Sequence, residues 1–198
     1  MNREKYVYNF HEGNADMKAL LGGKGANLAQ MVGYGLPVPP GFILTTHACL
    51  EYGKNPSFLD EIWNDVSSAM SDLERETGKK FGAGDNPLLV SVRSGAPVSM
   101  PGMMDTVLNL GLNDESVESL AKISNDRRFA YDSYRRFIQM YGNVVHGVEG
   151  EHFEEVLTRT KKSLSVQFDN EIPEKELEGV ARQFKKIFEE KTGTPFPS

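Results

Sequence analysis

Arg93 is the side chain whose type and surroundings best suit chemistry on an anion. It ends an apolar run that starts at Leu88, and a guanidinium beside a core needs an anionic partner. Its planar fork fits carboxylate and phosphate oxygens alike. Hydroxyls and unhindered backbone N–H groups, the usual material of a phosphate-binding loop, follow at Ser94, Gly95, Ser99 and Gly102. A phosphate site is one interpretation, and a structural ion pair with an Asp or Glu is the other.

Lys24 lies in a second stretch that could bind phosphate, LLGGKGANLAQM (residues 20–31). A glycine-rich loop that opens a helix favours anions, because the first helical N–H groups and the helix dipole point at them. The stretch is not a Walker loop, since Lys18 occupies the first glycine position and Gly25 follows the lysine. It is not a dinucleotide fingerprint either, because Leu28 replaces the last glycine. Lys24 could equally be a solvated lysine in a turn.

Patterns for other chemistry are weak. No Cys/His cluster has zinc spacing, and no acidic run matches a calcium loop. Asp105 could touch a metal or substrate, or cap the turn before Val107. We interpret Cys49 as a small core residue. The histidines stand apart, with no obvious Ser or Cys partner, at positions 11, 47, 146 and 152.

The elements that must position Arg93 and Lys24 are short strands and helices. Leu88 to Val92 predicts a strand buried on both faces, which delivers Arg93 into a loop. Aromatic and β-branched residues predict further strands over residues 6–10 and 41–46. A short helix is expected over residues 28–32 and another after Thr46 as its cap. Ser57 is the expected N-cap of a helix that buries Trp63 and stops at Gly78.

After Gly111 the pattern becomes helical. Helices are expected over residues 114–123, 127–145, 151–164 and 174–191, the last beginning at Pro173. Asp132 lies four residues from Arg128 and Arg136, so we expect local salt bridges to explain the arginines at 127, 128, 135 and 136. We therefore predict an α+β fold with a mixed α/β part, residues 1–111, and an all-helical subdomain, residues 112–198.

Composition restricts the partners and the location. The formal net charge is -6, and residues 1–111 and 112–198 each contain three more acidic than basic side chains. Nucleic acid binding is disfavoured, because neither part has a basic surplus. No apolar run reaches the length of a membrane span, and the N-terminus lacks a signal or transit pattern. We expect a soluble cytoplasmic protein.

Four blocks together resemble the pyruvate phosphate dikinase family in its N-terminal region. They are LLGGKGANLAQM, GLPVPPGFILTT, PLLVSVRSGAPVSMPGMMDTVLNLGLN and RFAYDSYRRFIQMYGNVV. The resemblance runs from about Tyr6 to the C-terminus. It implies a truncated ATP-grasp nucleotide-binding domain in which Lys24 and Arg93 contact phosphate, with Arg93 as the catalytic residue. Gly102, Met103 and Thr106 fall in the loop that resembles the family's cover over the polyphosphate.

The resemblance also implies a reaction and partners. ATP with Mg²⁺ phosphorylates a histidine on a separate domain, phosphate takes up the other phosphoryl group, and pyruvate becomes phosphoenolpyruvate at a C-terminal barrel. The metal ligands are expected outside this chain, in the remaining half of the nucleotide domain, and the parent enzyme is expected to be a homodimer. Two alternatives stay open. They are a stand-alone module that binds a phosphorylated ligand or a partner, and a related dikinase of the phosphoenolpyruvate synthase type.

Overall fold

The computed structural model describes residues 4–95 and 106–197, and the chain folds into two compact units. The N-terminal unit holds residues 4–78 and 94–95, and the C-terminal unit holds residues 79–93 and 106–197. Both units combine helices with two-stranded pairings, which confirms the α+β class. The boundary expected near Leu112 stays a prediction about domain organisation.

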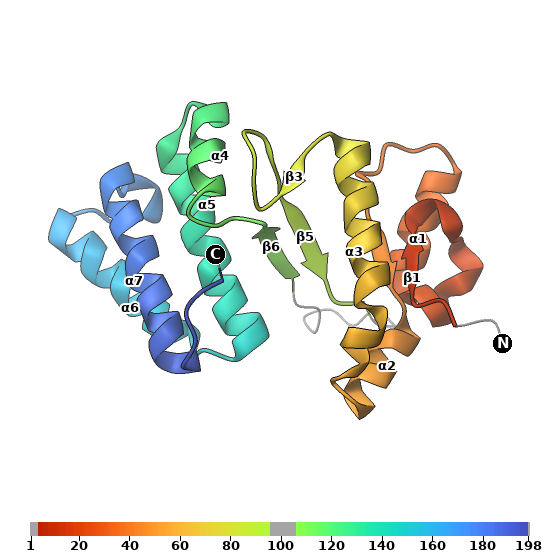
Figure 1. Cartoon of the computed structure of the whole chain (residues 1–198). Helices are drawn as coiled ribbons and strands as arrows, with labels where there is room; N and C mark the ends of the chain where they lie inside the picture. Colours follow the sequence, from red (N-terminus) through yellow and green to blue (C-terminus); the bar gives the residue numbers. More distant parts are fainter. Residues whose placement is uncertain (1–3, 96–105, 198) are drawn as a thin grey trace. The chain divides into compact units, whose positions relative to one another are not determined.

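The N-terminal unit packs three helices around one strand pair (Figure 1). Strand β1 (Val7–Asn9) runs antiparallel to β2 (Phe42–Leu44). The helices are α1 (Lys18–Gly33), α2 (Thr46–Lys54) and α3 (Phe58–Thr77), and two 3₁₀ turns, η1 (Phe10–Glu12) and η2 (Ala15–Met17), lead from β1 into α1. Strands are thus confirmed at both expected places, although each is shorter than its apolar stretch.

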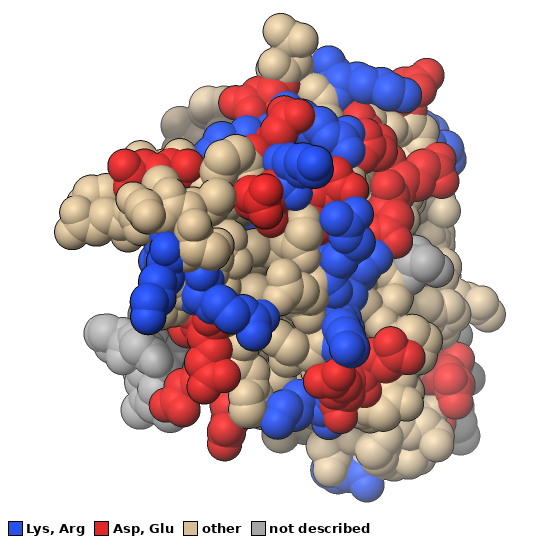
Figure 2. All heavy atoms as spheres, turned by 90° about the vertical axis from the view of Figure 1, so that its left-hand side faces the viewer, with Lys and Arg blue, Asp and Glu red and all other residues tan. Residues whose placement is uncertain are grey.

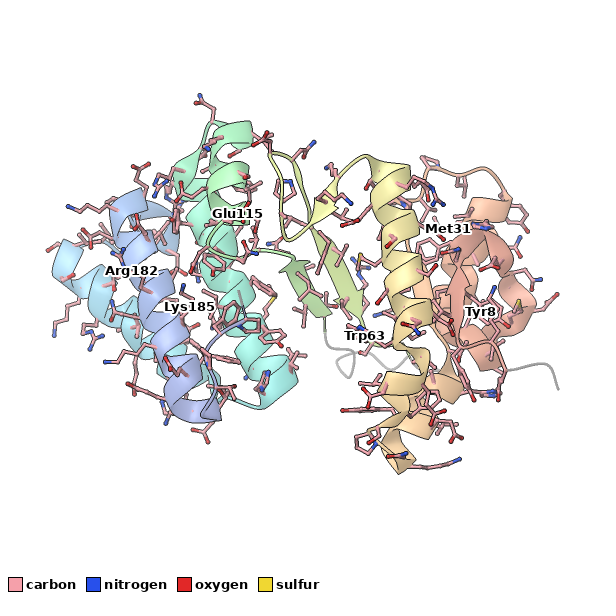
Figure 3. The ribbon with its side chains drawn as sticks, viewed as in Figure 1. Tyr8, Met31, Trp63, Glu115, Arg182 and Lys185 are labelled. Atoms are coloured by element: carbon pink, nitrogen blue, oxygen red, sulfur yellow. The ribbon has the colours of Figure 1, made fainter. Side chains whose placement is uncertain are left out.

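Local sequence signals set the ends of α2 and α3. Ser57 precedes α3, and Gly78 ends it with a left-handed φ of 67°, as expected for a glycine stop. The hydroxyl of Thr45, one residue earlier than predicted, caps α2 by accepting a bond from the Ala48 N–H at 3.1 Å. Two burial predictions are wrong, because Cys49 is exposed and Trp63 projects from α3 with 60% of its surface exposed (Figure 3). The α3 core face carries Phe58, Ile62, Ala69 and Leu73 instead.

The C-terminal unit joins two strand pairs to a bundle of helices. Strand β3 (Lys80–Phe81) pairs in parallel with β4 (Pro87–Leu88), and β5 (Val90–Arg93) pairs antiparallel with β6 (Thr106–Leu110). The helices are α4 (Ser116–Ser124), α5 (Arg127–Met140), α6 (Gly150–Leu164) and α7 (Glu174–Thr192). A π-turn, η3 (Tyr141–Val145), extends α5, and a 3₁₀ turn, η4 (Asp169–Glu171), precedes α7. All four predicted helices are confirmed.

The core of this unit lies between α5, α6 and α7. Amphipathic faces meet there, and burial of their apolar area is the main driving force for this packing. The largest fully buried side chains of this cluster are Val117, Tyr134, Ile138, Phe153, Leu157, Ile172, Leu177, Val180 and Phe184. On β6, Val107 belongs to the same cluster, so the β5–β6 hairpin is anchored on the helices.

The prediction that Leu88 to Val92 form one strand buried on both faces is wrong. Leu88 is buried in β4, but Val92 in β5 is 50% exposed. The apolar run is divided between two strands with different partners, and β5 pairs only with β6 among the described residues. With a single partner strand among the described residues, β5 is not covered on both faces.

Candidate functional site

Lys24 lies just after a break in α1. Gly22 has φ 71° and ψ 165°, which is not helical, and the helix resumes at Gly23. The expected glycine-rich loop is thereby reduced to one residue, and Lys24 stands in the first turn of the resumed helix. Free N–H groups and the positive end of the helix dipole are found in such a turn.

Close packing against β2 fixes the backbone around Lys24. Gly25 is buried, and a Cβ placed there would come within 3.0 Å of the Ile43 side chain. Lys24 itself is half-buried, and no ion pair among the described residues involves it. Because no described carboxylate pairs with it, its ammonium group is available to bind an anion.

Arg93 and Thr106 are brought together by strand pairing. Arg93 is the last residue of β5, Thr106 is the first of β6, and the two are register partners. Arg93 is exposed, and its Nε donates to the hydroxyl of Ser91 at 3.4 Å. The other predicted loop residues, Gly102 and Met103, lie outside the described residues.

The two halves of the predicted site fall in different units. Lys24 belongs to the N-terminal unit, whereas Arg93 and Thr106 belong to the C-terminal unit. A single phosphate site made from both stays a prediction. Ser91 was not among the predicted site residues. The alternation of side chains along a strand nevertheless places residues 91 and 93 on one face.

The arginines of α5 contact carboxylates and carbonyls of the folded unit. Arg135 is only 3% exposed and lies 2.7 Å from Asp132 and 3.0 Å from Asp169. Arg136 also pairs with Asp132, as predicted. The predicted salt bridge of Arg128 is wrong, because Arg128 donates to the backbone carbonyls of Ile172 and Asp169, more than forty residues along the chain.

The carboxylates that serve these arginines and their neighbours have perturbed pKa values. Burial alone would raise the pKa of Asp169, but the hydrogen bond from Lys161 and the charge of Arg135 outweigh it and hold the pKa below 3.8. The hydrogen bond from Arg127 lowers the pKa of Glu118 in the same way. These groups therefore stay charged at neutral pH as parts of ion pairs.

Surface charge on the helices consists of mixed pairs. Figure 2 shows Lys and Arg interspersed with Asp and Glu on the face that it presents. On α7, Arg182 pairs with Glu178 at 2.7 Å, and Lys185, labelled beside it in Figure 3, pairs with Asp114 at 2.6 Å. Pairs of this kind neutralise one another locally and do not form a strong field for a polyanion.

A cleft in the N-terminal unit has the wrong charge for a phosphate group. It has a volume of about 380 Å³ and lies between the start of β1 and α3. Four carboxylates and one lysine line it, at Glu4, Glu12, Asp65, Asp72 and Lys5. A surplus of carboxylates repels phosphate, so this cleft does not serve as an ATP phosphate site.

The described ranges contain neither a metal-binding cluster nor a helix suited to a membrane. No group of three or more His, Cys, Asp or Glu side chains there could hold a metal ion. None of the helices in residues 4–95 and 106–197 combines the length and the apolar character that a membrane span requires.

Comparison with known proteins identifies the class of domain first. Residues 18–63, which include Lys24, match the family described as the AMP/ATP-binding domain of pyruvate phosphate dikinase. Almost the whole chain is also similar to longer proteins of that name. It is 52% identical over 195 residues to the pyruvate, phosphate dikinase of Clostridium symbiosum, and 52% identical over 198 residues to that of Rhizobium meliloti.

A chloroplastic relative shows the same similarity. The chain is 50% identical over 188 residues to the pyruvate, phosphate dikinase of Mesembryanthemum crystallinum. These matches cover 98%, 98% and 94% of the chain but only 22%, 22% and 20% of the three relatives. The resemblance is therefore confirmed: the chain corresponds to an N-terminal portion of a pyruvate phosphate dikinase, and it spans about a fifth of the length of the curated relatives that it matches.

Proposed function

We propose that this chain supplies part of the ATP site of a pyruvate phosphate dikinase. That activity converts ATP, phosphate and pyruvate to AMP, pyrophosphate and phosphoenolpyruvate through a phosphohistidine. The observation that carries the proposal is identity at about half of all positions over nearly the whole chain, to enzymes of this name. A match to an AMP/ATP-binding domain across residues 18–63 supports the assignment of the nucleotide to this region.

Lys24 and Arg93 are the proposed phosphate contacts, and Arg93 is the proposed catalytic residue. Phosphoryl transfer depends mainly on positioning and on neutralising the charge that develops on the phosphate oxygens. Both side chains carry a positive charge, and no described carboxylate forms an ion pair with either. Thr106 stands opposite Arg93, and with Gly102 and Met103 it forms the proposed cover over the polyphosphate.

Magnesium enters this proposal as part of the substrate, MgATP. The described residues contain no cluster that fits a resident metal ion, so no step is assigned to a metal held by this chain. The remaining half of the nucleotide domain, the histidine-bearing domain and the acceptor barrel are proposed to lie in the same parent polypeptide. That parent is proposed to be a cytoplasmic homodimer.

The comparisons support the dikinase and not the stand-alone binding module. Relatives of the same name align with nearly the whole chain, whereas a module would be expected to match only around its phosphate-binding residues. A dikinase of the phosphoenolpyruvate synthase type would differ in its acceptor site, which lies in the proposed barrel.

Calorimetric titration with MgATP tests the proposal. The 198-residue chain and the full-length parent protein are titrated in parallel, each with Lys24→Met and Arg93→Met variants. We expect the parent to bind more tightly, and each variant to lose at least about tenfold in affinity, which corresponds to about 1.4 kcal/mol.

Matched controls come from exposed cations of the N-terminal unit. Lys18→Met changes a lysine of the same helix α1, and Arg75→Met removes an exposed arginine of α3 that pairs with Asp72. Both variants should bind MgATP like the unaltered protein. Equal losses in the control and site variants would contradict the assignment of Lys24 and Arg93.

A further inference from the structure

Strand β6 contains one residue more than β5 between two of their paired positions. Val90 pairs with Leu110, and Val92 pairs with Val107, so a single residue of β5 faces two residues of β6. Those two are Leu108 and Asn109, opposite Ser91. Asn109 has φ 59°, in the left-handed region, where asparagine is one of the few non-glycine residues to occur. This is a β-bulge, a feature that re-aims side chains.

The bulge lets two side chains of β6 reach the same core. In a regular strand, Val107 and Asn109 would share a face, because side chains alternate with a period of two. Here Val107 is 6% exposed and belongs to the helical core cluster, and Leu110 packs against that cluster as well. The extra residue shifts the alternation, so both apolar side chains contact the core and Asn109 does not take a core position.

The opposite face of the hairpin gathers polar side chains. Arg93 and Thr106 are cross-strand partners and therefore share a face. Ser91, two residues before Arg93, lies on the same face. The hydrogen bond between them agrees with this placement, because the Ser91 hydroxyl accepts from Arg93 Nε at 3.4 Å. The face away from the core thus presents a guanidinium, a hydroxyl that contacts it, and a threonine, next to the exposed Leu108.

This contact restrains Arg93 without consuming its binding edge. An arginine has five N–H donors, and only the Nε donor points at Ser91. The terminal nitrogens stay available for a bidentate contact with phosphate oxygens. An unrestrained arginine populates many rotamers, so ordering it on binding costs conformational entropy. A side chain that is already positioned in the free protein avoids most of this cost.

We propose that Ser91 is a positioning residue for Arg93, and that the bulge at Asn109 fixes the strand register that keeps their shared face turned away from the helical core. The inference rests on the proposed function, because it assigns to Arg93 a phosphate group as its ligand. Two readouts are needed so that the positioning and the phosphate binding can fail separately.

The first readout is independent of any ligand. In the ¹⁵N-labelled 198-residue chain, the Nε–H signal of Arg93, assigned by its loss in Arg93→Lys, reports the hydrogen bond to Ser91. We expect Ser91→Ala to shift this signal and to speed its exchange with water, and Ser91→Thr to restore it. Ser163→Ala, which removes an exposed hydroxyl on α6, is the matched control and should leave the signal unchanged. An unchanged signal in Ser91→Ala would overturn the proposal.

The second readout is titration with inorganic pyrophosphate. We expect Ser91→Ala to weaken binding by about three- to tenfold, the range of one modest hydrogen bond, and Ser91→Thr to recover most of the loss. In an Arg93→Lys background, which lacks the Nε donor, Ser91→Ala should cause no further loss. An equal loss in both backgrounds would mean that Ser91 acts without Arg93, which would overturn the proposal. If the unaltered chain does not bind pyrophosphate, the proposed function loses support while the Nε–H signal still decides the positioning.

The bulge is tested by a pair of substitutions at Asn109. Asn109→Gly introduces a residue that also tolerates the left-handed region, so the Arg93 Nε–H signal should be retained. Asn109→Val disfavours that region, and the signal should move as in Ser91→Ala. Core methyl signals of α5 and α7 show whether the valine variant stays folded. Retention of the Arg93 signal in a folded Asn109→Val variant would contradict the role of the bulge.

Discussion

Arg135 and Arg93 lie in the same unit and illustrate two uses of one side chain. Arg135 is almost completely buried, and two carboxylates, Asp132 and Asp169, neutralise it. Arg93 is exposed at the end of a strand, and its described contact is the neutral hydroxyl of Ser91. The difference shows that the partners, and not the residue type, separate an arginine that supports the fold from one that is available to a ligand.

The largest expected effect is on the free energy of unfolding when the buried Arg135 is replaced. Arg135→Met leaves Asp132 and Asp169 close together without the cation between them, so we expect a loss of about 3 kcal/mol in the free energy of unfolding. Arg93→Met should change that free energy by less than about 0.5 kcal/mol, as is usual for exposed positions. Urea denaturation followed by circular dichroism measures both. Similar losses for the two variants would break the distinction.

For ligand affinity, in contrast to stability, replacing Arg93 should have a larger effect than replacing an arginine of α5. Arg93→Met is expected to weaken binding of pyrophosphate by at least about tenfold, or about 1.4 kcal/mol, because one charge-assisted contact is lost. Arg136→Met removes an exposed arginine of α5 that pairs with Asp132 and should leave the affinity unchanged. Calorimetric titration of the 198-residue chain measures this, and an equal loss in Arg136→Met would point to a general effect of charge.

Acid should weaken the network around the buried arginine. The pKa of Asp169 is lower in the folded protein than its ordinary 3.8, so its ionised form stabilises the fold. That contribution is complete above the unfolded pKa and is lost as the pH falls through the folded pKa. Between about pH 5 and about pH 2, the unaltered chain should lose more stability than Asp169→Asn, measured by urea denaturation at each pH. Parallel curves would contradict this assignment.

The smallest expected effect is at an arginine–carboxylate pair on the surface, in contrast to the buried network around Arg135. Arg182 and Glu178 form an exposed pair one helical turn apart on α7. Arg182→Ala should change the free energy of unfolding by less than about 0.5 kcal/mol, because solvent and salt screen such pairs. A thermal melt at low and at moderate salt measures it. A loss approaching that of Arg135→Met would show that exposure does not set the energetic rank of these arginines.

The helices could be predicted from the sequence because their signals are local. Apolar spacing and Pro173 predict a helix over residues 174–191, and α7 occupies Glu174–Thr192. The helix expected over residues 151–164 begins only one residue earlier in the structure. Periodicity, caps and stop residues act within a few positions of each other, so one sequence contains the information.

The strands and the candidate site depended on contacts that the sequence does not display. The run from Leu88 to Val92 is apolar enough for a buried strand, but it is divided between β4 and β5, and Val92 is 50% exposed although its register partner Val107 is buried. The partners of Arg128 are carbonyls at Asp169 and Ile172, which periodicity along α5 cannot indicate. The outward orientation of the face that carries Ser91 depends on the register set by the bulge opposite it. Each case requires a long-range pairing that local patterns leave undetermined.

The contact between Gly25 and Ile43 also has a consequence for the history of this protein family. A Cβ at position 25 would come within 3.0 Å of the Ile43 side chain, so the two positions share one volume. They should therefore have evolved as a pair: where a relative carries a larger residue at the position of Gly25, it should carry a smaller one at the position of Ile43. Selection for the placement of Lys24 would then leave its trace at a strand residue outside the proposed phosphate contacts.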